Sequence, residues 1–160
     1  MLKRSIITVL FLINCYSAQS QTKVSILYCG IKHEVYTIFG HVGIRVVTPA
    51  SDLVFNYGTF DTSTENFLQK YIKGTLEYSL SVEEYGSFVS SYIQEDRTVV
   101  EHMLNLSEQD ASLVSSHLIS TYNTADRYYA YQFLRNNCTD AASTPLLVLP
   151  STTLPKNLPP

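Results

Sequence analysis

The chain has 160 residues, of which 45% are hydrophobic, so its length and composition favour one domain with a substantial apolar core. Charged residues make up only 16%, and the formal net charge of −3 with a pI near 5.7 argues against a nucleic-acid-binding protein. The sequence shows no solenoid-type repeat and no Cys/His spacing typical of a metal site, so we expect neither a metal nor a cofactor.

Residues 1–20 have the pattern of a secretory signal peptide. Lys3 and Arg4 form a positive start, Ile6–Ile13 is apolar, and residues 18–20 (Ala-Gln-Ser) form a small-x-small cleavage site. The apolar stretch is shorter than the roughly 20 residues that a membrane span needs. We therefore expect cleavage near Gln21 and a periplasmic or secreted mature chain, with nine basic and fourteen acidic residues.

The cysteines allow two exclusive interpretations. Lipid attachment at Cys15 is disfavoured because Asn14, which precedes it, is large and polar, so Cys15 is expected to leave with the leader. Cys29 and Cys138 then remain, and in an oxidising compartment they could form one structural disulfide. A catalytic thiol at Cys138 would require its sulfur to be free, so the catalytic interpretation and the disulfide interpretation exclude each other.

The first half of the mature chain predicts three strands. Val24–Tyr28 is short and apolar, and in the segment from His41 to Val47 the apolar residues Val42, Ile44 and Val46 alternate on one face. A turn at residues 49–52 (Pro-Ala-Ser-Asp) makes Leu53–Tyr57 a plausible hairpin partner of the His41 strand.

The second half predicts helices alternating with strands, which makes the fold α+β. Three apparent capping pairs, each with a spacing of three residues, predict helix starts: Thr62/Glu65, Ser81/Glu84 and Ser107/Asp110. Gly74 is expected to end the first of these helices, and Gln94 lies near the end of the second. The intervening strands are expected at Leu76–Val82 and Arg97–Leu106, followed by a β-prone run at Tyr128–Leu134.

His41 and Cys138 form the candidate catalytic pair. His41 lies between Gly40 and Gly43 at the start of a strand, where another backbone or a substrate could approach closely. Cys138 follows a strand-like run and precedes a plausible first helical turn, a position that lowers a thiol pKa and favours a nucleophile. Asn56, on the neighbouring predicted strand, is well placed to orient the imidazole. His33, His102 and His117 are more simply explained as solvated or structural residues.

Several short motifs, in this order, resemble the N-terminal periplasmic domain of Lnb-type lipoprotein N-acyltransferases: residues 40–46 (GHVGIRV), 54–61 (VFNYGTFD), 104–106 (LNL) and 137–138 (NC). That domain is similar to the circularly permuted papain-like thiol fold. The resemblance implies a small antiparallel sheet with packed helices, with His41 as base, Cys138 as nucleophile and Asn56 as orienting residue. It further implies an acyl-thioester on Cys138, formed from a phospholipid or lipoprotein donor and transferred to an amine acceptor, with association at the membrane surface.

The C-terminal part departs from that pattern. Thr144-Pro145 is expected to end the helix after Cys138 early, and the Pro-rich residues 145–160 are expected to be disordered. The expected organisation is therefore a leader over 1–20, a thiol domain over 21–144 and a tail over 145–160. The sequence leaves open whether the chain is a shortened form of a longer membrane protein. The alternatives are a cysteine amidase or peptidase acting on cell-wall peptides, and an inactive binding domain with a Cys29–Cys138 disulfide.

Overall fold

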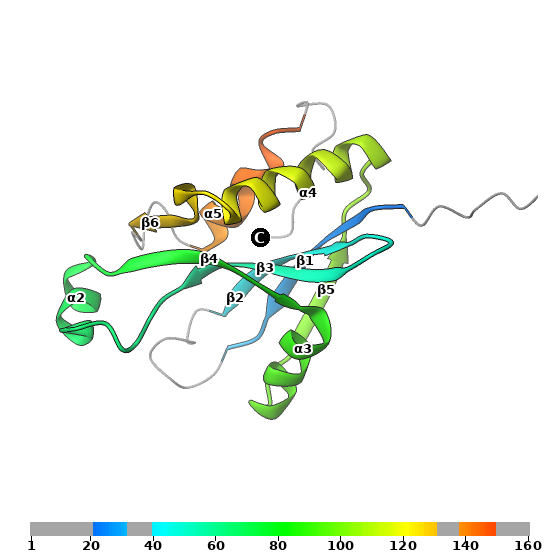
Figure 1. Ribbon diagram of the computed structural model, residues 1–160. Helices are drawn as coiled ribbons and strands as arrows, with labels where there is room; N and C mark the ends of the chain where they lie inside the picture. Colours follow the sequence, from blue (N-terminus) through cyan, green and yellow to red (C-terminus); the bar gives the residue numbers. More distant parts are fainter. Residues whose placement is uncertain (1–20, 32–39, 131–137, 150–160) are drawn as a thin grey trace, which may run out of the picture.

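The structure is a computed structural model that describes residues 21–31, 40–130 and 138–149, with the backbone alone at 138–140. The predicted leader lies outside the described residues. The fold is α+β, as expected: an antiparallel sheet with helices on both faces (Figure 1). The strands are β1 (Lys23–Cys29), β2 (His41–Val47), β3 (Asp52–Thr59), β4 (Glu77–Glu84), β5 (Val99–Met103) and β6 (Tyr128–Ala130). The α-helices are α2 (Phe67–Lys73), α3 (Tyr85–Gln94), α4 (Glu108–Tyr122) and α5 (Cys138–Ser143), and short 3-10 turns lie at Ala125–Arg127 and Thr144–Leu146.

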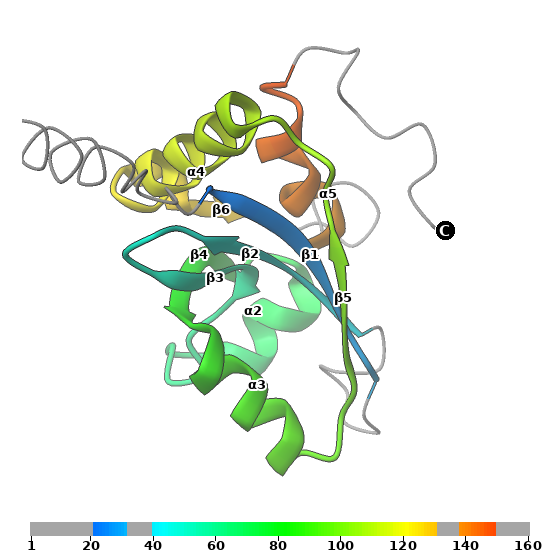
Figure 2. The same ribbon diagram turned by 90° about the vertical axis from the view of Figure 1, so that its right-hand side faces the viewer.

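The sheet has the strand order β5-β1-β2-β3-β4-β6, and every pairing is antiparallel. The predicted hairpin is confirmed, since β2 pairs with β3 through the turn at residues 48–51. The chain crosses from α3 back to the far edge, where β5 pairs with β1 (Figure 2). The two strands that carry His41 and Asn56 therefore lie side by side in the middle of the sheet.

One face of the sheet is covered by α4 and α5 and contains most of the apolar core. Alternating strand residues point into this layer, because successive side chains of a strand face opposite sides. Ile44 and Phe55 pack there against Leu118 of α4 and against Ala141 and Ala142 of α5. Both views show α4 and α5 in one layer above the sheet, with α3 below it (Figures 1 and 2).

The opposite face is covered by α3 and has a smaller apolar cluster. Leu27, Cys29 and Val54 of the sheet are buried against Phe88 of α3. Phe88 is buried, and three further residues of α3 are partly buried against the same cluster (Tyr85, Val89, Tyr92). His41 and Asn56 alternate with residues of the large core, so their side chains belong to this α3 face.

The three predicted capping pairs have different outcomes. The Ser107 side chain accepts a hydrogen bond from the Asp110 amide and caps α4, as predicted. The other two predictions are wrong. The residue that precedes α2 is Asn66, which makes no side-chain cap, and Ser81 lies within β4, where its hydroxyl hydrogen-bonds that of Thr59 at 2.7 Å. Ser81 is therefore part of the sheet, and α3 starts without a side-chain cap.

The C-terminal prediction is partly corrected. As expected, α5 begins at Cys138 and ends at Ser143, before Pro145. The expected tail, however, does not begin at residue 145, because Pro145, Leu146 and Leu149 are buried, the two leucines in the large core. Residues 150–160 lie outside the described part of the chain. No helix within the described ranges has the length and apolar character to cross a membrane.

A β-bulge interrupts the pairing of β3 with β4. Asn56 pairs with Ser81, but the next pair is Thr59 with Ser79, so β3 has one more residue than β4 between these pairs. Gly58 lies in this insertion with a φ of 92°, a conformation that favours glycine. The extra residue returns Thr59 to the same face of the sheet as Asn56 and Ser81.

Candidate active site

His41 is the first residue of β2 and lies at the end of the sheet. Gly40, before it, has a φ of 69°, and a Cβ atom at this position would approach the Cys29 carbonyl oxygen to 2.8 Å. A larger residue would therefore clash with β1 and also require a strained backbone. The glycine seen in the sequence brings the start of β2 close to the end of β1 and fixes the position of His41.

A chain of hydrogen bonds connects His41 to two residues on neighbouring strands. His41 Nε2 lies 3.2 Å from Asn56 Oδ1, and Asn56 Nδ2 donates to Glu83 Oε1 at 3.0 Å. Asn56 is only 5% exposed, so both ends of its amide are held by these partners. The predicted pairing of His41 with Asn56 is present in the structure, and Glu83 of β4 extends it.

This chain fixes the tautomer of His41. An ionised carboxylate can only accept hydrogen bonds, so the amide nitrogen of Asn56 faces Glu83 and its carbonyl oxygen faces His41. Nε2 of His41 must then carry the proton and donate it to Asn56. In the neutral imidazole the lone pair lies on Nδ1, which is therefore the nitrogen available as a base.

Gly43 provides the space that Asn56 occupies. It pairs directly with Asn56 across β2 and β3, and a Cβ at this position would lie 3.0 Å from Asn56 Oδ1 and 3.1 Å from Val54 Cγ1. The second glycine of the GHVG segment thus makes room for the side chain of Asn56. Its role is to allow close cross-strand packing.

A cavity of about 340 Å³ opens beside this chain on the α3 face. Its wall combines the His41–Asn56–Glu83 chain with aromatic and hydroxyl side chains and one guanidinium. The residues that line it are Gly40, His41, Asn56, Thr59, Phe60, Ser81, Glu83, Phe88, Tyr92 and Arg97. Such a mixture of apolar walls and a few convergent polar groups is typical of a small-molecule site.

Burial determines the protonation of the site. The pKa of His41 is lowered from its ordinary value, mainly by burial, which opposes the charged form; the hydrogen bond to Asn56 acts in the other direction, and the positive charge of Arg97 lowers the pKa further. His41 is therefore neutral at neutral pH and can accept a proton. The pKa of Glu83 is raised by burial, an effect that the hydrogen bond from Asn56 reduces.

Cys29 pairs directly with His41 across β1 and β2, and it is the cysteine whose side chain the structure describes. It is a free, buried cysteine whose sulfur receives a hydrogen bond from Tyr92. Burial raises the pKa of its thiol to about 11, so it is protonated at neutral pH and is a poor nucleophile. Because Cys29 is free, the structure does not contain the Cys29–Cys138 disulfide of the non-enzymatic alternative.

Cys138 opens α5, whose buried residues Ala141 and Ala142 pack on the face of the sheet opposite to the cavity. The helix lies against β2 and β3, the two strands that hold His41 and Asn56. The structure brings His41 and Asn56 together. For Cys138, the third predicted residue, it describes the backbone at the start of α5 but not the side chain.

Sequence reasoning missed Glu83, Tyr92 and Arg97. Glu83 ends an alternating strand and resembles a solvated surface residue. Arg97 was placed in a strand, but its side chain is only 7% exposed, its Nε donates to the Gly30 carbonyl oxygen at 2.9 Å, and its guanidinium lies 4.4 Å from the centre of the Tyr92 ring. The alternation that reveals strands does not reveal which acidic or basic residue a neighbouring strand and helix will cover.

The other described histidines do not line the cavity. His102 is exposed on the edge strand β5, where its ring meets Tyr28 edge-on at 5.6 Å, and His117 is half-buried on α4. His33 lies outside the described residues. Within the described ranges no group of three or more His, Cys, Asp or Glu residues is arranged to hold a metal ion.

The family described as the Lnb N-terminal periplasmic domain matches residues 14–153 of the chain. Neither the curated proteins nor the solved structures contain a significant match.

Proposed function

The chain belongs to the Lnb N-terminal periplasmic domain family, and on this premise we propose that it is a thiol-dependent acyltransferase domain that acts in the periplasm. In this proposal Cys138 is the nucleophile, His41 the general base and Asn56 the residue that orients the imidazole. The leader is removed near Gln21. A phospholipid or a lipoprotein donates the acyl group, and an amine accepts it.

The observation that carries the proposal is the contact of 3.2 Å between His41 Nε2 and Asn56 Oδ1. A half-buried, neutral imidazole with one nitrogen fixed by a hydrogen bond and the other available is the arrangement that a general base requires. It lies on a cavity, and a cysteine opens the helix that packs on the same two strands.

The proposed reaction has two acyl transfers. In the first, the Cys138 sulfur attacks the carbonyl carbon of the donor ester. A C–S bond forms, the ester C–O bond breaks, and the thiol proton passes through His41 Nδ1 to the leaving alcohol oxygen. In the second, the amine nitrogen attacks the thioester. A C–N bond forms, the C–S bond breaks, and the amine proton returns through His41 to the Cys138 sulfur.

The geometry sets one requirement on this mechanism. Because α5 packs on the face opposite to the cavity and His41 is the first residue of β2, the thiol must reach the imidazole around the end of the sheet, beside Gly40. Gly40 has no side chain to block this approach.

The test is the reactivity of Cys138. We expect iodoacetamide to modify Cys138 near neutral pH, and we expect His41→Ala to slow this modification by at least tenfold because the thiol loses its base. Peptide mapping locates the label and separates Cys138 from Cys29, which should stay unmodified in the folded protein. Equal rates of modification in the wild type and in His41→Ala would refute the proposal.

The amidase or peptidase alternative uses the same pair with water as the acceptor. Incubation with an acyl lipid, followed by intact mass measurement, should show an acylated protein that an added amine discharges as an amide. Discharge to the free acid alone, whatever the amine concentration, would favour the hydrolase.

A further inference from the structure

Arg97 brings a positive charge to the wall of the cavity and is almost entirely buried. Its side chain is 7% exposed, and it is the only cationic group among the described residues that line the cavity, since His41 is neutral at neutral pH. A buried charge is costly unless its hydrogen-bonding groups are satisfied. The partners of this guanidinium therefore show whether Arg97 only supports the fold or is also available to a ligand.

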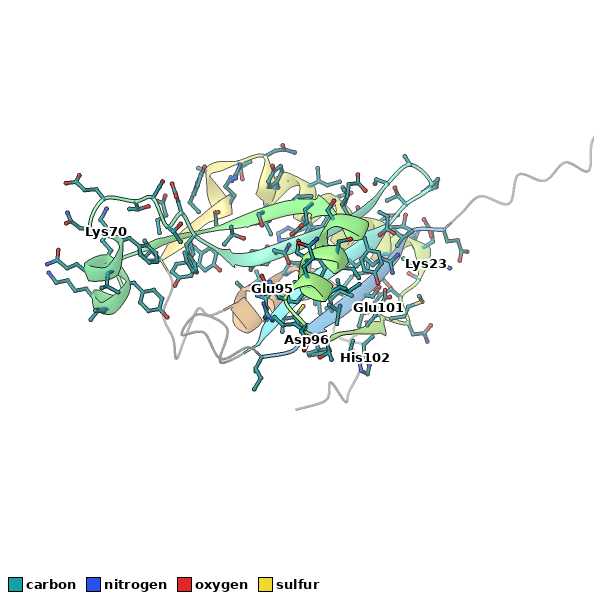
Figure 3. All side chains as sticks on the ribbon, turned by 90° about the horizontal axis from the view of Figure 1, so that it is seen from below. Lys23, Lys70, Glu95, Asp96, Glu101 and His102 are labelled. Carbon is teal, nitrogen blue, oxygen red and sulfur yellow. The ribbon has the colours of Figure 1, made fainter. Side chains whose placement is uncertain are left out.

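The backbone around Arg97 is held by the way in which α3 ends. Asp96 has a φ of 54°, a left-handed conformation that favours glycine, and its amide donates to the Ile93 carbonyl oxygen at 3.1 Å. The Arg97 amide donates to the Tyr92 carbonyl oxygen at 2.9 Å, which completes a Schellman motif. Figure 3 shows Glu95 and Asp96 beside each other at this end of the helix. The motif fixes the point from which the Arg97 side chain starts.

The guanidinium of Arg97 is also fixed, but only part of its hydrogen-bonding capacity is used. Nε donates to the Gly30 carbonyl oxygen at 2.9 Å, and Nη1 donates to Glu95 Oε2 at 3.0 Å. The group lies 4.4 Å from the centre of the Tyr92 ring. A guanidinium has five N–H donors, and no described acceptor binds Nη2. A rigid guanidinium with unused donors on a cavity can bind an anion without rearrangement.

The carboxylates near the cavity leave most of this charge available. Glu95 is 42% exposed, so solvent weakens its attraction for Arg97. Arg97 is bonded to Gly30, directly after β1, whereas Glu83 is on β4, and β1 and β4 are three strand spacings apart, about 14 Å. His41 on β2 and Asn56 on β3 lie between them in the strand order. The cavity therefore has a positive side at Arg97 and a negative side at Glu83.

We propose that Arg97 binds a group of the substrate in which two oxygens share one negative charge, a carboxylate or a phosphodiester. The planar fork of a guanidinium matches such a pair of oxygens. A single charge is favoured over two, because Glu83 and Glu95 oppose further negative charge in the same region. The volume of about 340 Å³ is near the lower end of ligand pockets, so the cavity would hold the anionic part of the substrate rather than all of it.

This inference deepens the proposed function, because it rests on the cavity being the substrate site and adds the charge of the group that the site selects. A phospholipid donor carries a phosphodiester, whereas a cell-wall peptide carries carboxylates. Binding of an anion requires neither Cys138 nor any reaction. A failure of anion binding is therefore distinguishable from a failure of acyl transfer.

The experiment titrates the chain, after removal of the leader, with diethyl phosphate and separately with acetate. NMR signals of the Arg97 Nε–H and of the His41 ring report binding, and chloride keeps the ionic strength constant because salt screens such interactions. We expect saturable shifts and a rise in the pKa of His41, since the anion neutralises the charge of Arg97 that lowers it. The probe that binds more tightly identifies the source of the group: diethyl phosphate indicates a lipid phosphodiester, and acetate indicates a peptide carboxylate.

Two substitutions should change the affinity in opposite directions. Arg97→Gln should weaken anion binding about tenfold, because it removes both the charge and the fork. Glu95→Gln should strengthen it about threefold, because it removes a competing carboxylate and releases Nη1. Lys23→Gln, an exposed change at the start of β1, is the control and should bind as the wild type does.

Shifts that do not saturate would overturn the proposal. So would an affinity that neither Arg97→Gln nor Glu95→Gln changes. If Arg97→Gln did not fold, Glu95→Gln would decide alone, since its carboxylate is half-exposed and a purely structural role of Arg97 would not connect it to anion affinity.

Discussion

The two faces of the sheet differ in what they contain. On the face covered by α4 and α5, the buried side chains are mostly hydrophobic or aromatic, and Ser115 of α4 is a buried polar residue there. On the face covered by α3, apolar residues alternate with a polar chain, a cavity and an ion-pair network in which Arg45 contacts Asp52 at 2.6 Å and Glu101 at 2.9 Å. The first face contributes most of the burial that stabilises the fold, and the second holds the groups that can do chemistry.

Two adjacent residues of β3 summarise this difference. Phe55 is 2% exposed and belongs to the large core, whereas Asn56 is 5% exposed and connects His41 to Glu83 on the other face. Their burial is nearly equal, so burial alone does not distinguish a residue that stabilises from one that orients. The direction of the side chain does.

The largest expected effect comes from changing the core residue of this pair. Phe55→Ala should lower the free energy of unfolding by about 3–5 kcal/mol, because it removes a buried ring and leaves a cavity. Asn56→Ala should cost less, about 1–3 kcal/mol, the typical cost of leaving buried polar partners unsatisfied. Urea unfolding of both variants tests this. If the asparagine variant were the less stable of the two, the division between the faces would be wrong.

A smaller effect is expected when the space for Asn56 is filled. Gly43→Ala places a methyl group 3.0 Å from Asn56 Oδ1 and should cost about 1–3 kcal/mol, as overpacking typically does. It should also separate Asn56 from His41, so the His41 ring should titrate differently in NMR spectra. Gly86→Ala is the matched control: a Cβ there meets nothing within 4 Å, so the variant should be as stable as the wild type or slightly more stable.

The smallest expected effect is a loss of stability in mild acid. The pKa of His41 is lowered in the folded state below its ordinary value of 6.5, so below pH 6.5 the unfolded chain binds a proton that the folded protein still excludes. The free energy of unfolding should therefore decrease as the pH falls from about 6.5 to the pKa of the folded state. Above pH 6.5 His41 is neutral in both states, and its stabilising contribution should be fully present. In His41→Gln this dependence should be reduced. If the dependence persisted unchanged, another group would be responsible.

Much of the fold could be predicted from the sequence, because it depends on local patterns. Alternation identified the strands, the turn predicted at residues 49–52 indicated the hairpin, and Ser107 identified the start of α4. The hairpin then explains why pairing His41 with Asn56 succeeded, since adjacent antiparallel strands bring such side chains together on one face.

The errors arose where a local pattern had to compete with tertiary structure. Ser81 has the right spacing for a cap but belongs to β4, which extends to Glu84. Glu83 was missed because its role depends on the β3–β4 register, which no short segment specifies.

The bulge at Gly58 makes the direction of the Thr59 side chain independent of the direction of the Asn56 side chain, whereas in a regular strand each would fix the other. Before it, the side chains of β3 follow the alternation that places Asn56 against His41; after it, the alternation is reversed, and Thr59 returns to the cavity wall. Removing Gly58 would therefore change the outer wall of the cavity without altering the register of His41 and Asn56. An insertion or deletion at this point of β3 can therefore change the rim of the cavity, while the contact between His41 and Asn56 remains unchanged.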